Sequence, residues 1–209
     1  VTAVREEFSR QKETICLHAY PSAPRQMAYL WSKELISQGI SFDEEYPDFE
    51  LLFETLLQSF IHRNKGKLVL CIEAFHHLTR LDSSFLSALV TLMSKSEYQN
   101  SIMVILSGNA VGYIENTFVS QIGTLAYSIS GFVKVKPLRF IDLVCYFDIP
   151  DIPKCMDFYA ISGGIPLHWS YFDGGKTMKE NICRLFLRKD AVFYKIGFDI
   201  VSDSLREPA

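Results

Sequence analysis

The stretch that decides the fold is Lys67-Leu-Val-Leu-Cys-Ile-Glu-Ala-Phe-His-His-Leu78, in which an unbroken apolar run ends on a carboxylate. Five consecutive apolar residues from Leu68 to Ile72 leave no polar face, so we expect a strand buried on both sides, as in a parallel sheet covered by helices. Glu73 then emerges at the carboxyl edge of the sheet, where ligands bind in open α/β folds. Two roles stay open for Glu73: a carboxylate that orders a metal ion, or a group that caps the next helical turn or meets a lysine.

Composition narrows the class of protein. The chain has 209 residues, 48% of them hydrophobic, and a formal net charge of -3, which gives no reason to expect nucleic acid as a partner. Its apolar runs are shorter than the about 20 residues that span a bilayer, and its N-terminus lacks secretory character, so we expect a soluble, cytoplasmic protein without membrane contact. Five widely spaced cysteines are typical of reduced thiols rather than of disulfides or a zinc site.

Helical and strand patterns alternate on both sides of this stretch. Apolar residues at helical spacing predict three helices, over residues 25–38, 49–61 and 82–96. Continuous or alternating apolar runs predict three further strands, over residues 14–20, 102–106 and 131–136. This order predicts an α/β fold with a parallel sheet and helices on both faces.

From Leu138 onward the sequence changes in character. Short helical patterns over residues 140–147, 154–162 and 178–187 are separated by proline and glycine, and no strand-like run interrupts them. We therefore expect residues 1–137 to form the α/β core and residues 138–209 a small helical subdomain that serves as a lid.

A strand–helix alternation with polar residues at strand ends raises the question of a phosphate-binding loop, G-x-x-x-x-G-K-[ST]. That pattern is absent from the sequence. Gly174-Gly175-Lys176-Thr177 has its last residues but neither its first glycine nor a preceding strand, so a turn between helices is the expectation there. His76 and His77 follow the central strand but lack a third ligand at familiar spacing, which argues against a metal site.

Five blocks in order give a family resemblance. They are Leu-Val-Leu-Cys-Ile-Glu-Ala-Phe (68–75), Val-Ile-Leu-Ser-Gly-Asn-Ala-Val-Gly (104–112), Val-Lys-Pro-Leu-Arg-Phe (135–140), Tyr-Ala-Ile-Ser-Gly-Gly-Ile-Pro (159–166) and Leu-Arg-Glu-Pro (205–208). With these blocks the chain resembles, over its whole length, the prokaryotic, archaeal-type ATPases near the AAA+ and STAND groups of P-loop NTPases, which are hydrolases of ATP.

The resemblance implies ATP bound between the sheet and the helical lid, with Mg²⁺ as its companion ion. In that scheme Glu73 orders the Mg²⁺ ion and its waters, and Asn109 is the sensor beside the γ-phosphate. Gly164 and Pro166 lie against the adenine. The glutamate that polarises the attacking water is expected at position 74, where this chain has Ala74.

Departures from the family pattern modify the expected function. Thr2 matches the end of the phosphate loop and would contact nucleotide, so the first strand and the loop itself are expected outside this sequence. Ser128 and Ile129 stand where the family has arginines. We therefore expect a degenerate or truncated ATPase core, an ATP-binding switch with weak or no hydrolysis. The alternative is a non-catalytic protein-interaction scaffold derived from that fold, with another protein or a second copy as partner.

Overall fold

The computed structural model describes residues 14–63, 67–79, 83–95, 101–147 and 151–198. The chain divides into two compact units, Val1–Ile129 and Ser130–Ala209, which are described separately. No helix within the described ranges combines the length and the apolar character that crossing a membrane requires.

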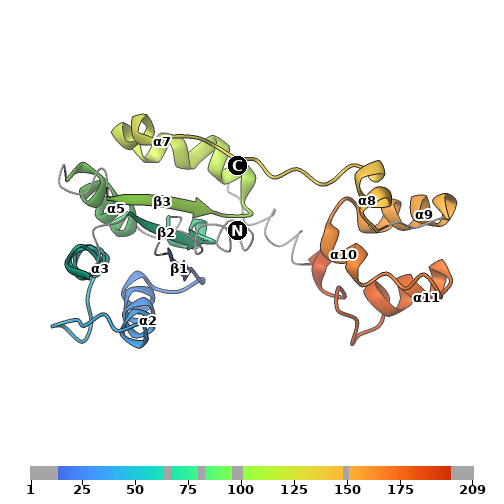
Figure 1. Ribbon diagram of the computed structural model, residues 1–209, viewed down its shortest axis with the longest axis horizontal. Helices are drawn as coiled ribbons and strands as arrows, with labels where there is room; N and C mark the ends of the chain where they lie inside the picture. Colours follow the sequence, from blue (N-terminus) through green and yellow to red (C-terminus); the bar gives the residue numbers. More distant parts are fainter. Residues whose placement is uncertain (1–13, 64–66, 80–82, 96–100, 148–150, 199–209) are drawn as a thin grey trace. The chain divides into compact units, whose positions relative to one another are not determined.

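The first unit is built on a parallel sheet of three strands in the order β1-β2-β3. The strands are β1 (Thr14–His18), β2 (Leu68–Glu73) and β3 (Ile102–Ser107), and their arrows run the same way in Figure 1. Leu68 to Ile72 are all buried, as the unbroken apolar run predicts. The predicted parallel α/β sheet is confirmed.

Helices follow each strand of this unit. The longer ones are α2 (Pro24–Ser37), α3 (Phe49–Arg63) and α5 (Ser84–Ser94), and α4 (His76–Thr79) is a single turn. After β3 come α6 (Val111–Tyr113), the π-helical turn η1 (Ile114–Phe118), α7 (Val119–Gln121) and the 3₁₀ helix η2 (Gly123–Ser128). The helical patterns before β3 predict their helices correctly, whereas the segment after β3 was not predicted to be helical.

The main hydrophobic core lies on one face of the sheet. It takes alternate residues from each strand, including Leu17, Leu70 and Ile72, and packs them against α2, α3 and α5. Within the described residues, the opposite face contributes no side chain to this core; that face carries Cys16 and Cys71. Helical cover is therefore seen on one face, and the predicted second layer of helices stays a prediction.

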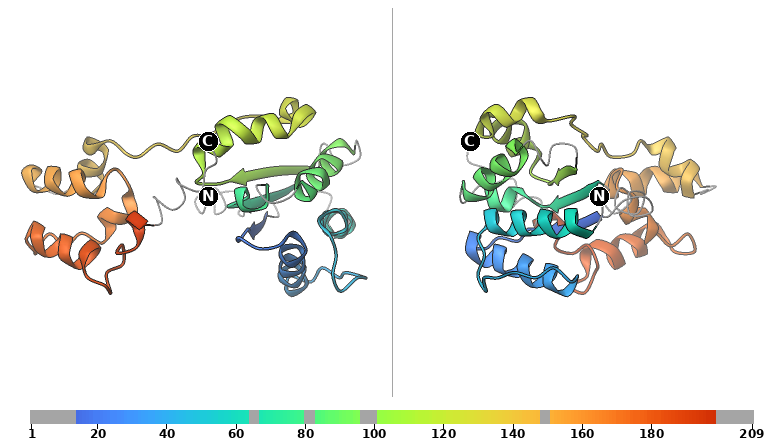
Figure 2. Two further views of the ribbon diagram at one scale, coloured as in Figure 1. Left: turned by 180° about the vertical axis from the view of Figure 1, so that it is seen from behind. Right: turned by 60° about the vertical axis from the view of Figure 1, so that its left-hand side comes forward.

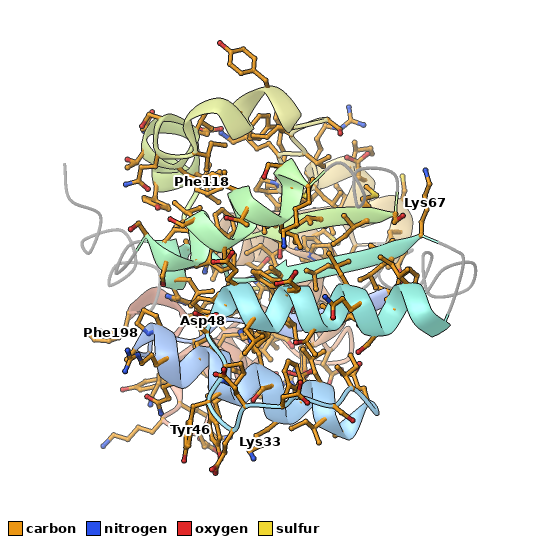
Figure 3. All side chains as sticks on the ribbon, turned by 90° about the vertical axis from the view of Figure 1, so that its left-hand side faces the viewer. Lys33, Tyr46, Asp48, Lys67, Phe118 and Phe198 are labelled. Carbon is orange, nitrogen blue, oxygen red and sulfur yellow. The ribbon has the colours of Figure 1, made fainter. Side chains whose placement is uncertain are left out.

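Local signals fix the ends of α2 and α3. Gly39 follows α2 with a φ of 85°, the left-handed turn expected of a glycine after a helix. At the start of α3 the Asp48 carboxylate accepts a hydrogen bond from the Leu51 amide at 2.9 Å, as an N-cap does. Figure 3 shows Asp48 where the connecting loop reaches α3, and Lys33 and Tyr46 at the outer side of α2.

All regular secondary structure described in the second unit is helical. Its helices are α8 (Phe140–Phe147), α9 (Ile152–Ser162), α10 (Pro166–Ser170), α11 (Met178–Ile182) and the π-helical turn η3 (Cys183–Leu187). They enclose a small core that includes Leu143, Phe158, Trp169 and Leu185. The predicted short helices are thus present, while the subdomain bounds of 138–209 and the role as a lid stay predictions.

The predicted strand over residues 131–136 is wrong. This segment has no regular secondary structure, and Figure 2 shows it as a plain extended connection. Its apolar side chains are in solvent, with Phe132, Val133 and Val135 exposed by 65%, 90% and 89%. β-branched residues favour extended backbone, but a strand also needs another strand alongside it, and the described sheet pairs only β1, β2 and β3.

Candidate functional site

Two of the predicted site residues lie at the carboxyl edge of the sheet. Glu73 is the last residue of β2 and is paired in register with Ser107, the last residue of β3. Asn109 follows two residues later and is exposed. Parallel strands end at the same edge, so the fold brings Glu73 and Asn109 to one rim, where open α/β sheets bind ligands.

Glu73 is paired with a residue that the sequence did not point to. The carboxylate Oε2 lies 3.3 Å from Nδ1 of His18, the last residue of β1, and the two side chains are 33% and 47% exposed. The His18 ring is also 4.6 Å from that of Tyr20. For a structural Glu73 the expectation was a cap on the next helical turn or a contact with a lysine. His18 could have been predicted as the partner, because it is a polar residue at the end of the strand that pairs with β2.

A hollow of about 240 Å³ opens beside this pair, between the end of β1 and helix α2. The Trp31 indole nitrogen donates to the His18 carbonyl at 2.9 Å, which fixes the end of β1 against the helix. The hollow brings together two carboxylates, a histidine, a thiol and aromatic rings: Cys16, His18, Tyr20, Trp31, Glu34 and Glu73.

The backbone immediately after Glu73 is strained. Ala74 has a φ of 55°, and it is the one non-glycine residue with positive φ in the described part of the chain. The left-handed region costs an L-residue roughly 1–2 kcal/mol. The cost is sustained because the chain is hydrogen-bonded on both sides: the Ala19 amide donates to the Glu73 carbonyl at 2.9 Å, and the Phe75 amide to the Ser107 carbonyl at 3.2 Å. Strain of this kind clusters at functional sites.

Substitution of Ala74 tests this conformation. We expect Ala74→Gly to leave the free energy of unfolding unchanged or to raise it by up to about 1 kcal/mol, because relief of strain outweighs the added freedom of the unfolded chain. Ala74→Val should lower it by about 1–2 kcal/mol, since a β-branched residue fits the left-handed region poorly. Urea titration followed by circular dichroism measures both. The reverse order of the two variants would contradict the positive φ.

His76 and His77 have a packing explanation. His76 is buried, and its ring centroid lies 4.2 Å from that of His77. A Cβ on Gly108 would approach Nδ1 of His76 to 2.8 Å, so the glycine after β3 makes room for this ring. Among the described residues, no group of three His, Cys, Asp or Glu side chains could hold a metal ion.

The remaining predicted residues lie elsewhere. Thr2 is outside the described residues. Gly164 and Pro166 belong to the helical unit, where the Leu138 amide donates to the Gly164 carbonyl at 2.8 Å. A Cβ on Gly164 would lie 2.1 Å from the Leu138 carbonyl oxygen, so this close backbone contact requires a glycine. Pro166 occupies the first turn of α10, a position that suits proline.

The Gly174–Thr177 segment is a turn followed by a helix start, as predicted. Asp173 forms an ion pair with Lys176, whose hydrogen bond lowers the pKa of the Asp173 carboxyl. Thr177 and Glu180 form a capping box at the start of α11. Hydrogen bonding to Thr177 lowers the pKa of Glu180. The lysine is thus engaged locally rather than aimed at a phosphate.

Comparisons with known proteins support the fold. No family model matches the chain, and no curated protein matches its sequence. Among solved structures, the Walker-type ATPase of Pyrococcus abyssi matches with a TM-score of 0.53 and 14% sequence identity. The match covers 98% of this chain and 66% of the ATPase chain. At this identity the likeness supports an ATPase-like fold alone.

Proposed function

We propose that this chain is an ATPase-derived, nucleotide-binding switch, in which Glu73 helps to hold Mg²⁺-ATP. The observation that carries the proposal is the placement of Glu73: a part-exposed carboxylate at the carboxyl end of the central parallel strand, followed directly by strained Ala74. The likeness of fold to a Walker-type ATPase supports the same assignment.

The described residues suit Mg²⁺ only if a bound nucleotide supplies further ligands. Mg²⁺ commonly binds one or two carboxylates together with phosphate oxygens and waters. Glu73 offers one such carboxylate, and no group of three acidic, histidine or cysteine side chains accompanies it among the described residues. ATP phosphates would therefore complete the ion's ligands.

Each residue of the site has a distinct proposed part. Glu73 would orient the ion's waters, and the nearby His18 would orient the carboxylate through their 3.3 Å contact. Asn109 would donate its amide to the terminal phosphate. Ala74 has no group that polarises water, so we propose weak or no hydrolysis; loss of such a group costs orders of magnitude in rate.

The helical unit would respond to nucleotide through the Gly163–Pro166 turn. We propose that adenine packs against Gly164 and Pro166, as the family resemblance implies, and that binding there alters the helical unit. The hydrogen bond from the Leu138 amide to the Gly164 carbonyl, 2.8 Å long, would then connect this turn to the residues that precede α8.

Calorimetry of the full-length protein with ATP, with and without Mg²⁺, tests this function. We expect Mg²⁺-dependent heat, and Glu73→Gln should weaken the Mg²⁺-dependent affinity by about tenfold to a hundredfold, the equivalent of one charged contact. Glu34→Gln is the matched control, because Glu34 lines the same hollow from α2 and has no proposed role with Mg²⁺. Equal losses in both variants would contradict a specific role for Glu73.

A protein-interaction scaffold is the second candidate. It is favoured by the contact between Glu73 and His18, which gives the carboxylate a partner without any ion, and by Ala74. A scaffold would show no heat with Mg²⁺-ATP in the same titration. Its partner would be another protein or a second copy of this chain.

A further inference from the structure

Two of the five cysteines stand side by side on neighbouring strands. Cys16 of β1 and Cys71 of β2 are paired in the parallel register. Paired residues project from the same face of a sheet, and neighbouring strands lie about 4.8 Å apart. That spacing falls inside the roughly 4.4–6.8 Å between Cα atoms that a disulfide spans. Both cysteines are free thiols.

The two thiols differ in access to solvent. Cys71 is only 1% exposed. Cys16 is half-buried and lines the hollow beside His18 and Glu73. A small dissolved oxidant therefore reaches the Cys16 sulfur first.

Burial separates Cys71 from dissolved oxidants. Burial, the neighbouring Cys16 and the charge of Glu73 together raise the pKa of the Cys71 thiol to about 12. Because Cys71 is out of reach of a dissolved oxidant, it does not compete as the first nucleophile, and the register of β1 and β2 places it next to Cys16.

We propose that Cys16 and Cys71 are a redox-active dithiol that a peroxide closes into a disulfide across β1 and β2. The Cys16 thiolate attacks one peroxide oxygen, the O–O bond breaks, and the other oxygen leaves as water after taking a proton. Cys16 is then a sulfenic acid. The Cys71 sulfur displaces its hydroxyl, which leaves as a second water with the Cys71 proton. Two electrons pass from the thiols to the peroxide.

The sheet geometry makes this disulfide reversible. Its Cβ atoms must approach to about 3.5–4.5 Å, which draws the two strands closer than their usual spacing. Strained disulfides are reduced more readily than relaxed ones. His18 and Glu73 lie two residues further along the same strands, so closure would also displace the pair at the rim.

Peptide mapping of the reduced, full-length protein after exposure to hydrogen peroxide tests the proposal. We expect a linked pair of peptides that contain Cys16 and Cys71, which dithiothreitol separates. In Cys71→Ser, Cys16 should accumulate as a dimedone-labelled sulfenic acid, several-fold above the wild-type level. In Cys16→Ser, Cys71 should stay a thiol. Cys145→Ser is the control: Cys145 is exposed, and its loss should leave the link unchanged.

The wild-type measurement decides the proposal even if a serine variant fails to fold. Absence of the linked peptides in folded protein would overturn it, as would a link that involves Cys145 in place of Cys71. Oxidation of Cys71 in folded Cys16→Ser would overturn the assigned order. None of these outcomes depends on nucleotide, so they are independent of the calorimetric test.

Discussion

Replacing Phe85 by alanine should lower the free energy of unfolding of the sheet unit by about 3–5 kcal/mol, the range for removing a buried aromatic ring. Phe85 is the second residue of α5 and is 1% exposed. Its ring lies 6.3 Å from Trp31 of α2, and 5.5 Å and 6.1 Å from Phe49 and Phe53 of α3. One truncation therefore removes edge-to-face contacts with two other helices and leaves a cavity between them.

Two variants show whether the loss comes from this packing. Phe85→Leu retains most of the volume and should lose less than Phe85→Ala. Tyr127→Ala removes an aromatic ring that is 94% exposed and should change stability by less than about 0.5 kcal/mol. Urea titration followed by circular dichroism and tryptophan fluorescence measures all three. Equal stabilities of Phe85→Ala and Tyr127→Ala would contradict the aromatic core described here.

Gly164→Ala should destabilise the helical unit by about 2–4 kcal/mol, comparable to severe overpacking. The added Cβ would lie 2.1 Å from the oxygen and 2.7 Å from the nitrogen of Leu138, both backbone atoms. Backbone cannot rotate away as a side chain can, so the Leu138–Gly164 hydrogen bond must break. Tyr159, whose hydroxyl donates to the Leu138 carbonyl at 3.0 Å, would lose its partner too.

Gly174→Ala is the matched control, because nothing lies within 4 Å of the Cβ it adds and its φ is not positive. Its stability should stay within about 0.5 kcal/mol of the wild type or rise slightly. Peptide-level hydrogen exchange around residues 138–166 reports the effect directly. Unchanged protection of that region in Gly164→Ala would show that the close contact is not formed in solution.

Sequence patterns were most informative where one structural signal dominated. The apolar run ending at Glu73 predicted the central strand and its carboxyl edge, because burial on both sides leaves only one arrangement for such a run. The helical spacing from Phe49 to Ile61 predicted α3 for a similar reason. The Gly174–Thr177 turn was predicted because a glycine-rich turn depends on local backbone conformation.

The patterns failed where the outcome depended on distant neighbours. Residues 131–136 have strand propensity, but pairing is decided by whether another strand lies alongside. His18 and Glu73 are 55 positions apart and meet only through the register of β1 and β2, as do Cys16 and Cys71. The helical turns after β3 mix α, π and 3₁₀ geometry, which no single period describes.

The exposed apolar side chains of Phe132, Val133 and Val135 also affect how the protein behaves at high concentration. Exposed extended segments rich in β-branched residues are templates for joining chains edge to edge, and β3, with Met103 45% exposed, pairs within the described residues only with β2. Lys134 and Lys136 interrupt the run, and Pro137 ends it, which are the devices that natural proteins use against such self-association. Loss of those lysines would therefore remove a safeguard against aggregation.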